Sequence, residues 1–133
     1  MSTVLHLAER TDWALARTTG TYRRSTRGLS VDDTGFVHAS IATQLPSVAE
    51  AFYADLAADV LVLLVVDLDT LAEHGIEVRW ESPDVGPELF PHLYGGFPVT
   101  AVRAALPIGW SDGRLVLPDL TGMDVATGPP TDA

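Results

Sequence analysis

The chain has 133 residues, 47% of them hydrophobic and 20% charged, with a formal net charge of -10. These values fit one globular domain with a single core, and the acidic balance argues against general affinity for nucleic acid or anionic membranes. The absence of cysteine excludes disulfides, zinc held by cysteine and thiol nucleophiles. The first residues show no secretory signal pattern, and the apolar run over residues 60–66 is shorter than the about 20 residues of a membrane span, so we expect a cytoplasmic protein.

Strands and helices are predicted from apolar alternation, helical spacing and Gly/Pro stops. The first half reads as a strand over residues 4–8, a helix over 13–18 ended by Gly20, an arginine-bearing loop over 22–33, a strand over 35–40 and a helix near 43–56. The second half reads as a buried strand over 59–67, a helical turn over 68–74 and strands over 77–81, 90–94, 101–106 and 114–117.

This order predicts an α+β fold: one compact domain over residues 1–120, with a mixed or split β-sheet and two to three helices. Residues 121–133 are polar and rich in proline and glycine, which predicts a flexible C-terminal tail.

Three of the four histidines lie in predicted strands, between apolar neighbours: His6, His38 and His92. A buried imidazole needs hydrogen-bond partners, so a structural role is the ordinary interpretation for any one of them. Three together favour a shared cleft. His74 precedes a glycine in a turn and is expected to be solvated.

Residues near the two later histidines supply suitable partners. Ser40 and Tyr94 each follow a histidine by two positions, so on a strand each shares that histidine's face. Gln44 lies at a predicted helix start, where backbone N–H groups favour anions. Glu81, two residues after Arg79, closes a strand before a Pro/Gly loop; this placement suits a catalytic acid or base and equally an ordinary surface glutamate.

Four arginines and no acid lie between Trp13 and Ser30: Arg17, Arg23, Arg24 and Arg27. Guanidinium groups match phosphate or carboxylate in bidentate geometry, which predicts a local anion site; a solvated loop is the alternative. Metal binding is not expected, because no His-x-His, His-x-x-x-His or His-Glu-x-x-His pattern is present. Nor is there a nucleophile elbow, a GxGxxG pattern or a P-loop.

At these residues the sequence resembles a bacterial family, domain-of-unknown-function family 952. The resemblance covers roughly residues 4–106 and is carried by these motifs: His6-Leu7, Trp13, Gly20-x-Tyr22, Gly35-Phe36-Val37-His38-x-Ser40, Gln44, Val48-Ala49-x-x-Phe52-Tyr53, Leu61 to Asp67, Arg79-Trp80-Glu81 and Phe90-Pro91-His92-Leu93-Tyr94-Gly95. Ala39 stands where the family often has cysteine, and the tail is longer.

That family is similar to a compact ADP-ribosyltransferase-like fold. The likeness implies a split-sheet cleft able to hold NAD, with His6 at the ribose and either Glu81 or His92 at the third, catalytic place. The usual His-Tyr-Glu or Arg-Ser-Glu series is not reproduced cleanly.

We therefore expect an enzyme acting on an anionic small molecule, with NAD or another nucleotide as the candidate. In this hypothesis His38 and His92 are acid/base or orienting groups, with Glu81 as the other catalytic candidate. The remaining candidates are expected to bind substrate: His6, Tyr22, Arg24, Arg27, Ser40, Gln44, Arg79 and Tyr94. A non-catalytic ligand-binding module and a purely structural role for the histidines are the alternatives. The sequence leaves the oligomeric state open.

Overall fold

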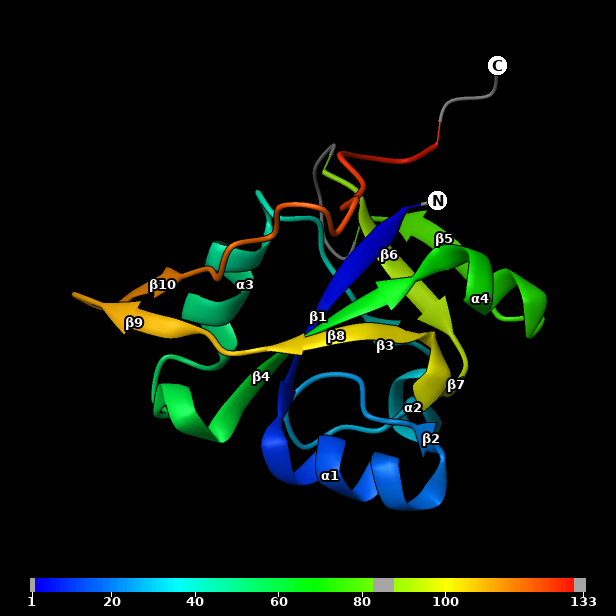
Figure 1. Ribbon diagram of the computed structural model, residues 1–133, viewed down its shortest axis with the longest axis horizontal. Coiled ribbons are helices and arrows are strands. Elements are labelled where there is room, and N and C mark those ends of the chain that lie inside the picture. Colours follow the sequence, from blue (N-terminus) through cyan, green and yellow to red (C-terminus); the bar gives the residue numbers. More distant parts are fainter. Residues whose placement is uncertain (1, 83–87, 131–133) are drawn as a thin grey trace.

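The computed structural model describes residues 2–82 and 88–130, and it shows an α+β domain made of several antiparallel sheets (Figure 1). The strands are β1 (Thr3–Glu9), β2 (Thr21–Tyr22), β3 (Val37–His38), β4 (Leu61–Asp67), β5 (Glu77–Glu81), β6 (Phe90–Tyr94), β7 (Phe97–Pro98), β8 (Val102–Leu106), β9 (Gly109–Ser111) and β10 (Arg114–Val116). The helices are α1 (Arg10–Thr19), α2 (Val31–Thr34), α3 (Leu45–Phe52) and α4 (Leu68–Glu73), with 3-10 turns η1 (Ala58–Val60) and η2 (Val99–Ala101). None of the described helices is long and apolar enough to cross a membrane.

The central sheet has the order β1-β4-β8, and its middle strand contributes residues to both hydrophobic core clusters. Every residue of β4 is buried, as its β-branched and leucine-rich sequence predicts for a strand covered on both faces. One face of this sheet packs against α3 and the β9–β10 hairpin through Leu63, Leu45 and Leu115. The other face packs against the rest of the domain through Leu64, Leu93 and Phe97.

A second sheet, with the order β3-β6-β5, holds the later histidine motifs. Its strands are antiparallel, and His38 lies directly opposite His92 while Arg79 lies opposite His92 on the other side. Because side chains alternate along a strand, Val37, Leu93 and Trp80 point into the core from the opposite face. The side chains of His38 and His92 therefore lie on the face of this sheet that does not pack into the core.

The two three-stranded sheets meet where Ser40, the last residue of the Gly35–Ser40 motif, lies beside β1. The backbone N–H of Leu5 donates to the Ser40 carbonyl at 2.8 Å, and the Ser40 N–H donates back to the Leu5 carbonyl at 2.8 Å. This short bridge brings His6 beside His38, although the two are 32 residues apart in sequence.

Several predicted elements differ in detail from the structure. The segment over residues 22–33 is not wholly irregular, because it contains Tyr22 of β2 and most of α2, which begins with a Ser30–Asp33 capping box. The described residues thus form four α-helices rather than the predicted two to three, since a four-residue helix is too short to show periodicity. The predicted strand over 35–40 is paired as β3 only at Val37 and His38, and Asp59 belongs to η1 rather than β4.

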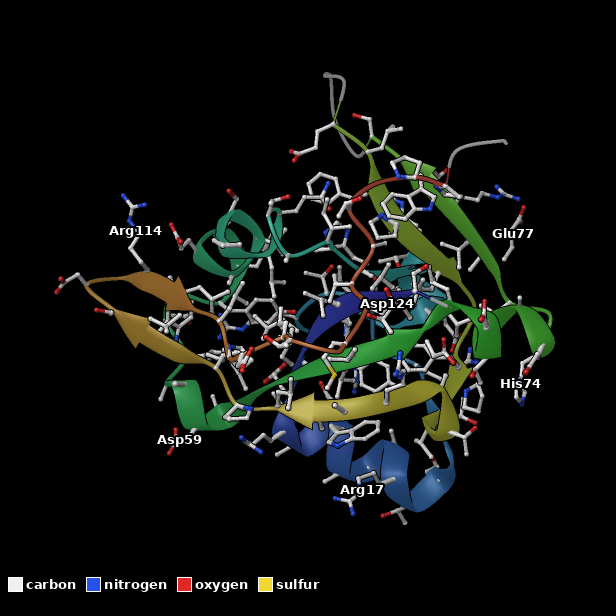
Figure 2. All side chains as sticks on the ribbon, turned by 45° about the horizontal axis from the view of Figure 1, so that its top comes forward. Arg17, Asp59, His74, Glu77, Arg114 and Asp124 are labelled. Carbon is white, nitrogen blue, oxygen red and sulfur yellow. The ribbon has the colours of Figure 1, made fainter. Side chains whose placement is uncertain are left out.

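The C-terminal segment was predicted to be a flexible tail, but its described part runs back over β1, and Asp124 lies over the middle of the molecule (Figure 2). The Thr3 N–H donates to the Asp124 carbonyl at 2.9 Å, the Ala126 N–H donates to the Thr3 carbonyl at 2.8 Å, and the Thr3 hydroxyl donates to the Met123 carbonyl at 2.8 Å. Met123 and Val125 also pack against the core. Residues 123–126 are therefore part of the domain, and residues 131–133 lie outside the described range.

Truncation after Leu120 should lower the free energy of unfolding by about 3 kcal/mol, because it removes three hydrogen bonds to Thr3 and the packing of Val125. Truncation after Thr127 keeps these contacts and serves as the control. Urea unfolding of both variants measures the difference. An equal loss in the two variants would show that residues 121–127 add no stability.

Candidate functional site

His6 is fixed by two hydrogen bonds in the middle of β1. Its Nδ1 lies 2.7 Å from the backbone carbonyl oxygen of His38, and its Nε2 lies 2.8 Å from the hydroxyl oxygen of Tyr22. A carbonyl oxygen only accepts, so Nδ1 carries the proton; Nε2 is then the acceptor, and the Tyr22 hydroxyl donates to it. This assignment makes His6 a neutral imidazole.

Burial around this pair agrees with the neutral form. His6 is only 3% exposed, and burial lowers its pKa to about 4 despite the opposing effect of its bond to the His38 carbonyl. Burial also raises the pKa of Tyr22, which keeps the phenol protonated as a donor. Both polar atoms of the His6 ring thus already have partners, and His6 joins β1 to β2 and β3.

His38, His92 and Glu81 form a second, continuous chain of contacts. His38 Nδ1 lies 3.3 Å from His92 Nε2, and His92 Nδ1 lies 3.0 Å from Glu81 Oε1. The carboxylate accepts from Nδ1–H of His92, so neutral His92 presents its Nε2 lone pair to His38. His38 Nδ1–H then donates to His92, which leaves Nε2 as the remaining polar atom of the His38 ring.

The carboxylate at the end of this chain has further neighbours. The Tyr94 hydroxyl donates to the same Glu81 oxygen that His92 contacts. These bonds, first that of Tyr94 and then that of His92, lower the pKa of Glu81, so it stays ionised. The Arg79 guanidinium lies 4.5 Å above the Tyr94 ring and pairs with Glu77 at 2.8 Å, which places one cation on this face.

Aromatic rings surround the two later histidines. The Phe36 ring is stacked on His92, with centroids 4.1 Å apart and an angle of 12° between the planes. Phe90 lies 5.2 Å from His38, and Phe36 also contacts Tyr94 at 5.5 Å. These ring contacts restrict rotation of the two imidazoles.

The electrostatics of the cluster favour a neutral His38. Burial, followed by the neighbouring His92 and then His6, lowers the pKa of His38 to about 4. A positive charge on an adjoining imidazole opposes protonation of His38, because two imidazolium rings in contact repel each other.

Of the other residues predicted to bind substrate, Ser40 lies beside the histidines, whereas Arg24 and Arg27 are paired with carboxylates. Arg24 pairs with Asp12 at 3.4 Å and Arg27 pairs with Asp55 at 2.5 Å, and neither takes part in the hydrogen bonds or ring contacts of the histidines. Ser40 is buried beside β1 in a small cavity that His6 and His38 also line.

The amide of Gln44 has backbone partners on both sides. Its oxygen accepts from the Ile41 N–H at 3.1 Å, and its nitrogen donates to the Leu89 carbonyl at 2.7 Å. Gln44 is buried and therefore joins the start of α3 to the residue that precedes β6.

The expected concentration of positive charge is largely neutralised. A groove of about 500 Å³ lies between α1 and the arginine-bearing segment over residues 22–33. Arg23 and Arg24 line this groove together with Asp12 and Asp32. Arg23 pairs with Asp32 at 2.7 Å, so each arginine in the groove has its own carboxylate. Arg23, Arg24 and Arg27 are therefore paired with carboxylates rather than left free to bind an anion.

The part of the chain that the structure describes holds no group of three or more histidine or acidic side chains placed to bind a metal ion. His6 Nδ1 instead faces a carbonyl and His6 Nε2 a hydroxyl, while the two nitrogens of His92 face His38 and a carboxylate.

Two features of the site were not singled out from the sequence. Phe36 lies inside the Gly35–Ser40 motif, so its position beside a motif histidine was an available signal. Ser25 also lines the cavity of His6 and His38, but a serine in an irregular loop gives no sequence signal at all.

Fold and site define a small α+β domain whose two three-stranded sheets bring a buried histidine beside a histidine–histidine–carboxylate chain. The chain belongs to the family described as "Protein of unknown function (DUF952)", whose model matches residues 7–105. The crystal structure of protein CC0527 from Caulobacter crescentus is similar, with 26% identity and a TM-score of 0.70 over 90% of this chain and 95% of that one. The solution structure of the same protein gives 27% identity and a TM-score of 0.66 over 87% and 92%. The search of curated proteins returns no match.

Proposed function

We propose that this protein is an enzyme that carries out general acid–base chemistry on an anionic small molecule, with His38 and His92 as the proton-transfer pair. The single observation that carries the proposal is the unbroken chain Glu81–His92–His38, with 3.0 Å and 3.3 Å between successive atoms. A carboxylate, an imidazole and a second imidazole in hydrogen-bond order are suited to moving one proton and stabilising the charge that results.

The direction of proton movement follows from the tautomers. When His38 takes a proton at Nε2, it can pass its Nδ1 proton to His92 Nε2. The resulting charge on His92 lies against Glu81, whose own lowered pKa keeps it ionised and able to stabilise an imidazolium. Tyr94 and Phe36 orient the carboxylate and the His92 ring. His6, by contrast, serves as the anchor between the sheets.

The candidate substrate is NAD or another nucleotide, on the strength of the resemblance to the ADP-ribosyltransferase-like fold. The separate three-stranded sheets agree with the split-sheet cleft that this resemblance implies. Rings of Phe36, Phe90 and Tyr94 offer stacking partners for a heteroaromatic base, and Arg79 is the cation nearest to Glu81 and Tyr94. Arg79 is the arginine proposed to contact the anion because it lies over the Tyr94 ring beside the histidine cluster, although it also pairs with Glu77.

The experiment is a thermal-shift panel with NAD, nicotinamide, ADP-ribose and other nucleotides, followed by product analysis for any ligand that binds. We expect at least one nucleotide to raise Tm, and His92→Ala to abolish both the shift and any turnover. His74→Ala is the matched control, because His74 projects from the surface beyond α4 and its ring bonds locally to the Thr70 carbonyl (Figure 2). A panel with no shift for the wild type would contradict the proposal.

Two alternatives without catalysis remain: a module that binds a ligand, and a purely structural role for the histidines. Both are favoured by the burial of His92, which is 3% exposed and has a partner at each ring nitrogen. Saturable nucleotide binding without any product, undiminished in His38→Ala, would support a module. A loss of stability in His38→Ala with no ligand found would support the structural role.

A further inference from the structure

A small cavity adjoins His38 and His6. It is bounded by β1, Ser40, α3 and the turn that carries Ser25 and Thr26. Its accessible volume is about 10 Å³, close to the space that one water occupies and far too small for a nucleotide. The polar side chains around it are neutral, so it suits an uncharged molecule rather than an ion.

A buried hydroxyl in the wall of this cavity has no hydrogen-bond partner. Ser25 is only 2% exposed, and its Oγ contacts no donor or acceptor among the residues that the structure describes. The backbone holds Ser25 in place, because its N–H donates to the Leu29 carbonyl at 2.9 Å and the Leu29 N–H donates to the Thr26 carbonyl at 2.7 Å. A buried hydroxyl left without a partner costs on the order of 1–3 kcal/mol, so a polar occupant of the cavity is strongly favoured.

The His38 side chain is the second candidate partner for an occupant of the cavity. His38 lines the cavity, and its Nδ1 is taken by His92, so Nε2 is the ring atom left for an occupant. Neutral Nε2 accepts a hydrogen bond while the Ser25 hydroxyl can donate one, and Ser40 lies in the same wall. One water satisfies these demands together, since it donates twice and accepts twice.

We propose that this cavity is a water site, and that its water is the molecule with which His38 exchanges its proton. The hydrogen-bonded chain then runs from Glu81 through His92 and His38 to a water anchored by Ser25. The presence of the water is inferred from the cavity and from the Ser25 hydroxyl alone. Its role in proton exchange rests on the proposed function.

The test is a set of crystal structures at a resolution that defines ordered waters, for the wild type, Ser25→Val and Ser25→Ala. We expect a water within hydrogen-bond distance of Ser25 Oγ and His38 Nε2 in the wild type, its loss in Ser25→Val, which fills the space, and weaker density in Ser25→Ala. Ser47→Ala is the control, because Ser47 is an exposed serine of α3 outside the cavity.

A second readout follows His38 directly. The ¹⁵N chemical shift of His38 Nε2 at neutral pH should change in Ser25→Val and stay unchanged in Ser47→Ala. If Ser25→Val does not fold, the test uses the crystal structures of the wild type and Ser25→Ala, together with the ¹⁵N chemical shift of His38 Nε2 measured in both proteins. A wild-type cavity without water, or a water that does not contact His38, overturns the inference, whereas a failed nucleotide panel leaves the water site standing and removes only its role.

Discussion

Replacing His6 by alanine should lower the free energy of unfolding by about 3 kcal/mol, the largest stability effect we expect from any of the four histidines. The substitution leaves the Tyr22 hydroxyl and the His38 carbonyl without their partners in a buried region, at 2.8 Å and 2.7 Å from the missing nitrogens. It also opens space between β1 and the second sheet. Urea unfolding followed by tryptophan fluorescence measures the loss.

Two variants separate this explanation from a general sensitivity to histidine loss. His74→Ala, at an exposed position with one local bond to Thr70, should change stability by no more than about 0.5 kcal/mol. Tyr22→Phe keeps the stacking on Phe97 and removes only the hydroxyl, so it should cost about 1 kcal/mol. If His6→Ala proved as mild as His74→Ala, the role of His6 as an anchor would be wrong.

Acid should destabilise the protein, with a marked loss between about pH 6.5 and pH 4. Burial lowers the pKa of His6 from the ordinary 6.5 to about 4 in the folded protein, so as the pH falls the unfolded chain takes up the proton first. The stability due to neutral His6 is therefore fully present above pH 6.5 and is lost as the pH falls through 4, at about 1.4 kcal/mol per pH unit. His38, whose pKa is lowered to about 4 by burial and by His92, adds to the loss in the same direction.

The contribution of one histidine can be isolated from the many carboxylates of this acidic chain. The free energy of unfolding of His6→Ala should fall less steeply between pH 6.5 and 4 than that of the wild type, while His74→Ala should keep the wild-type slope. Denaturant unfolding at a series of pH values gives these slopes. Identical slopes for the wild type and His6→Ala would mean that His6 is not held neutral by burial.

Local sequence signals located the main elements because each signal depends on a short stretch of chain. The apolar run over residues 59–67 predicted a strand buried on both faces, which the structure has over Leu61–Asp67, and the observed β5 and β6 have the predicted bounds. Gly20 was expected to end the first helix, and it does so with φ of 93°, a left-handed conformation that glycine adopts without strain. Short or packing-dependent pieces such as α2 and β9 gave too little pattern to detect.

By itself, the sequence determined the fold class, the family and the choice of His38, His92 and Glu81 as neighbours in a candidate site, because these follow from apolar patterning and from motifs only a few residues long. Only the tertiary structure decided which partners each charge and each ring nitrogen has. The arginines looked free in the sequence, yet Arg24 and Arg27 are paired with Asp12 and Asp55, which no local pattern links to them. His6 reaches Tyr22 and His38 because β1 bridges to Ser40, and the order Glu81–His92–His38 arises from strand register. Register and long-range pairing depend on how distant segments pack together, so the site's position was predictable from local sequence while its hydrogen-bond order was not.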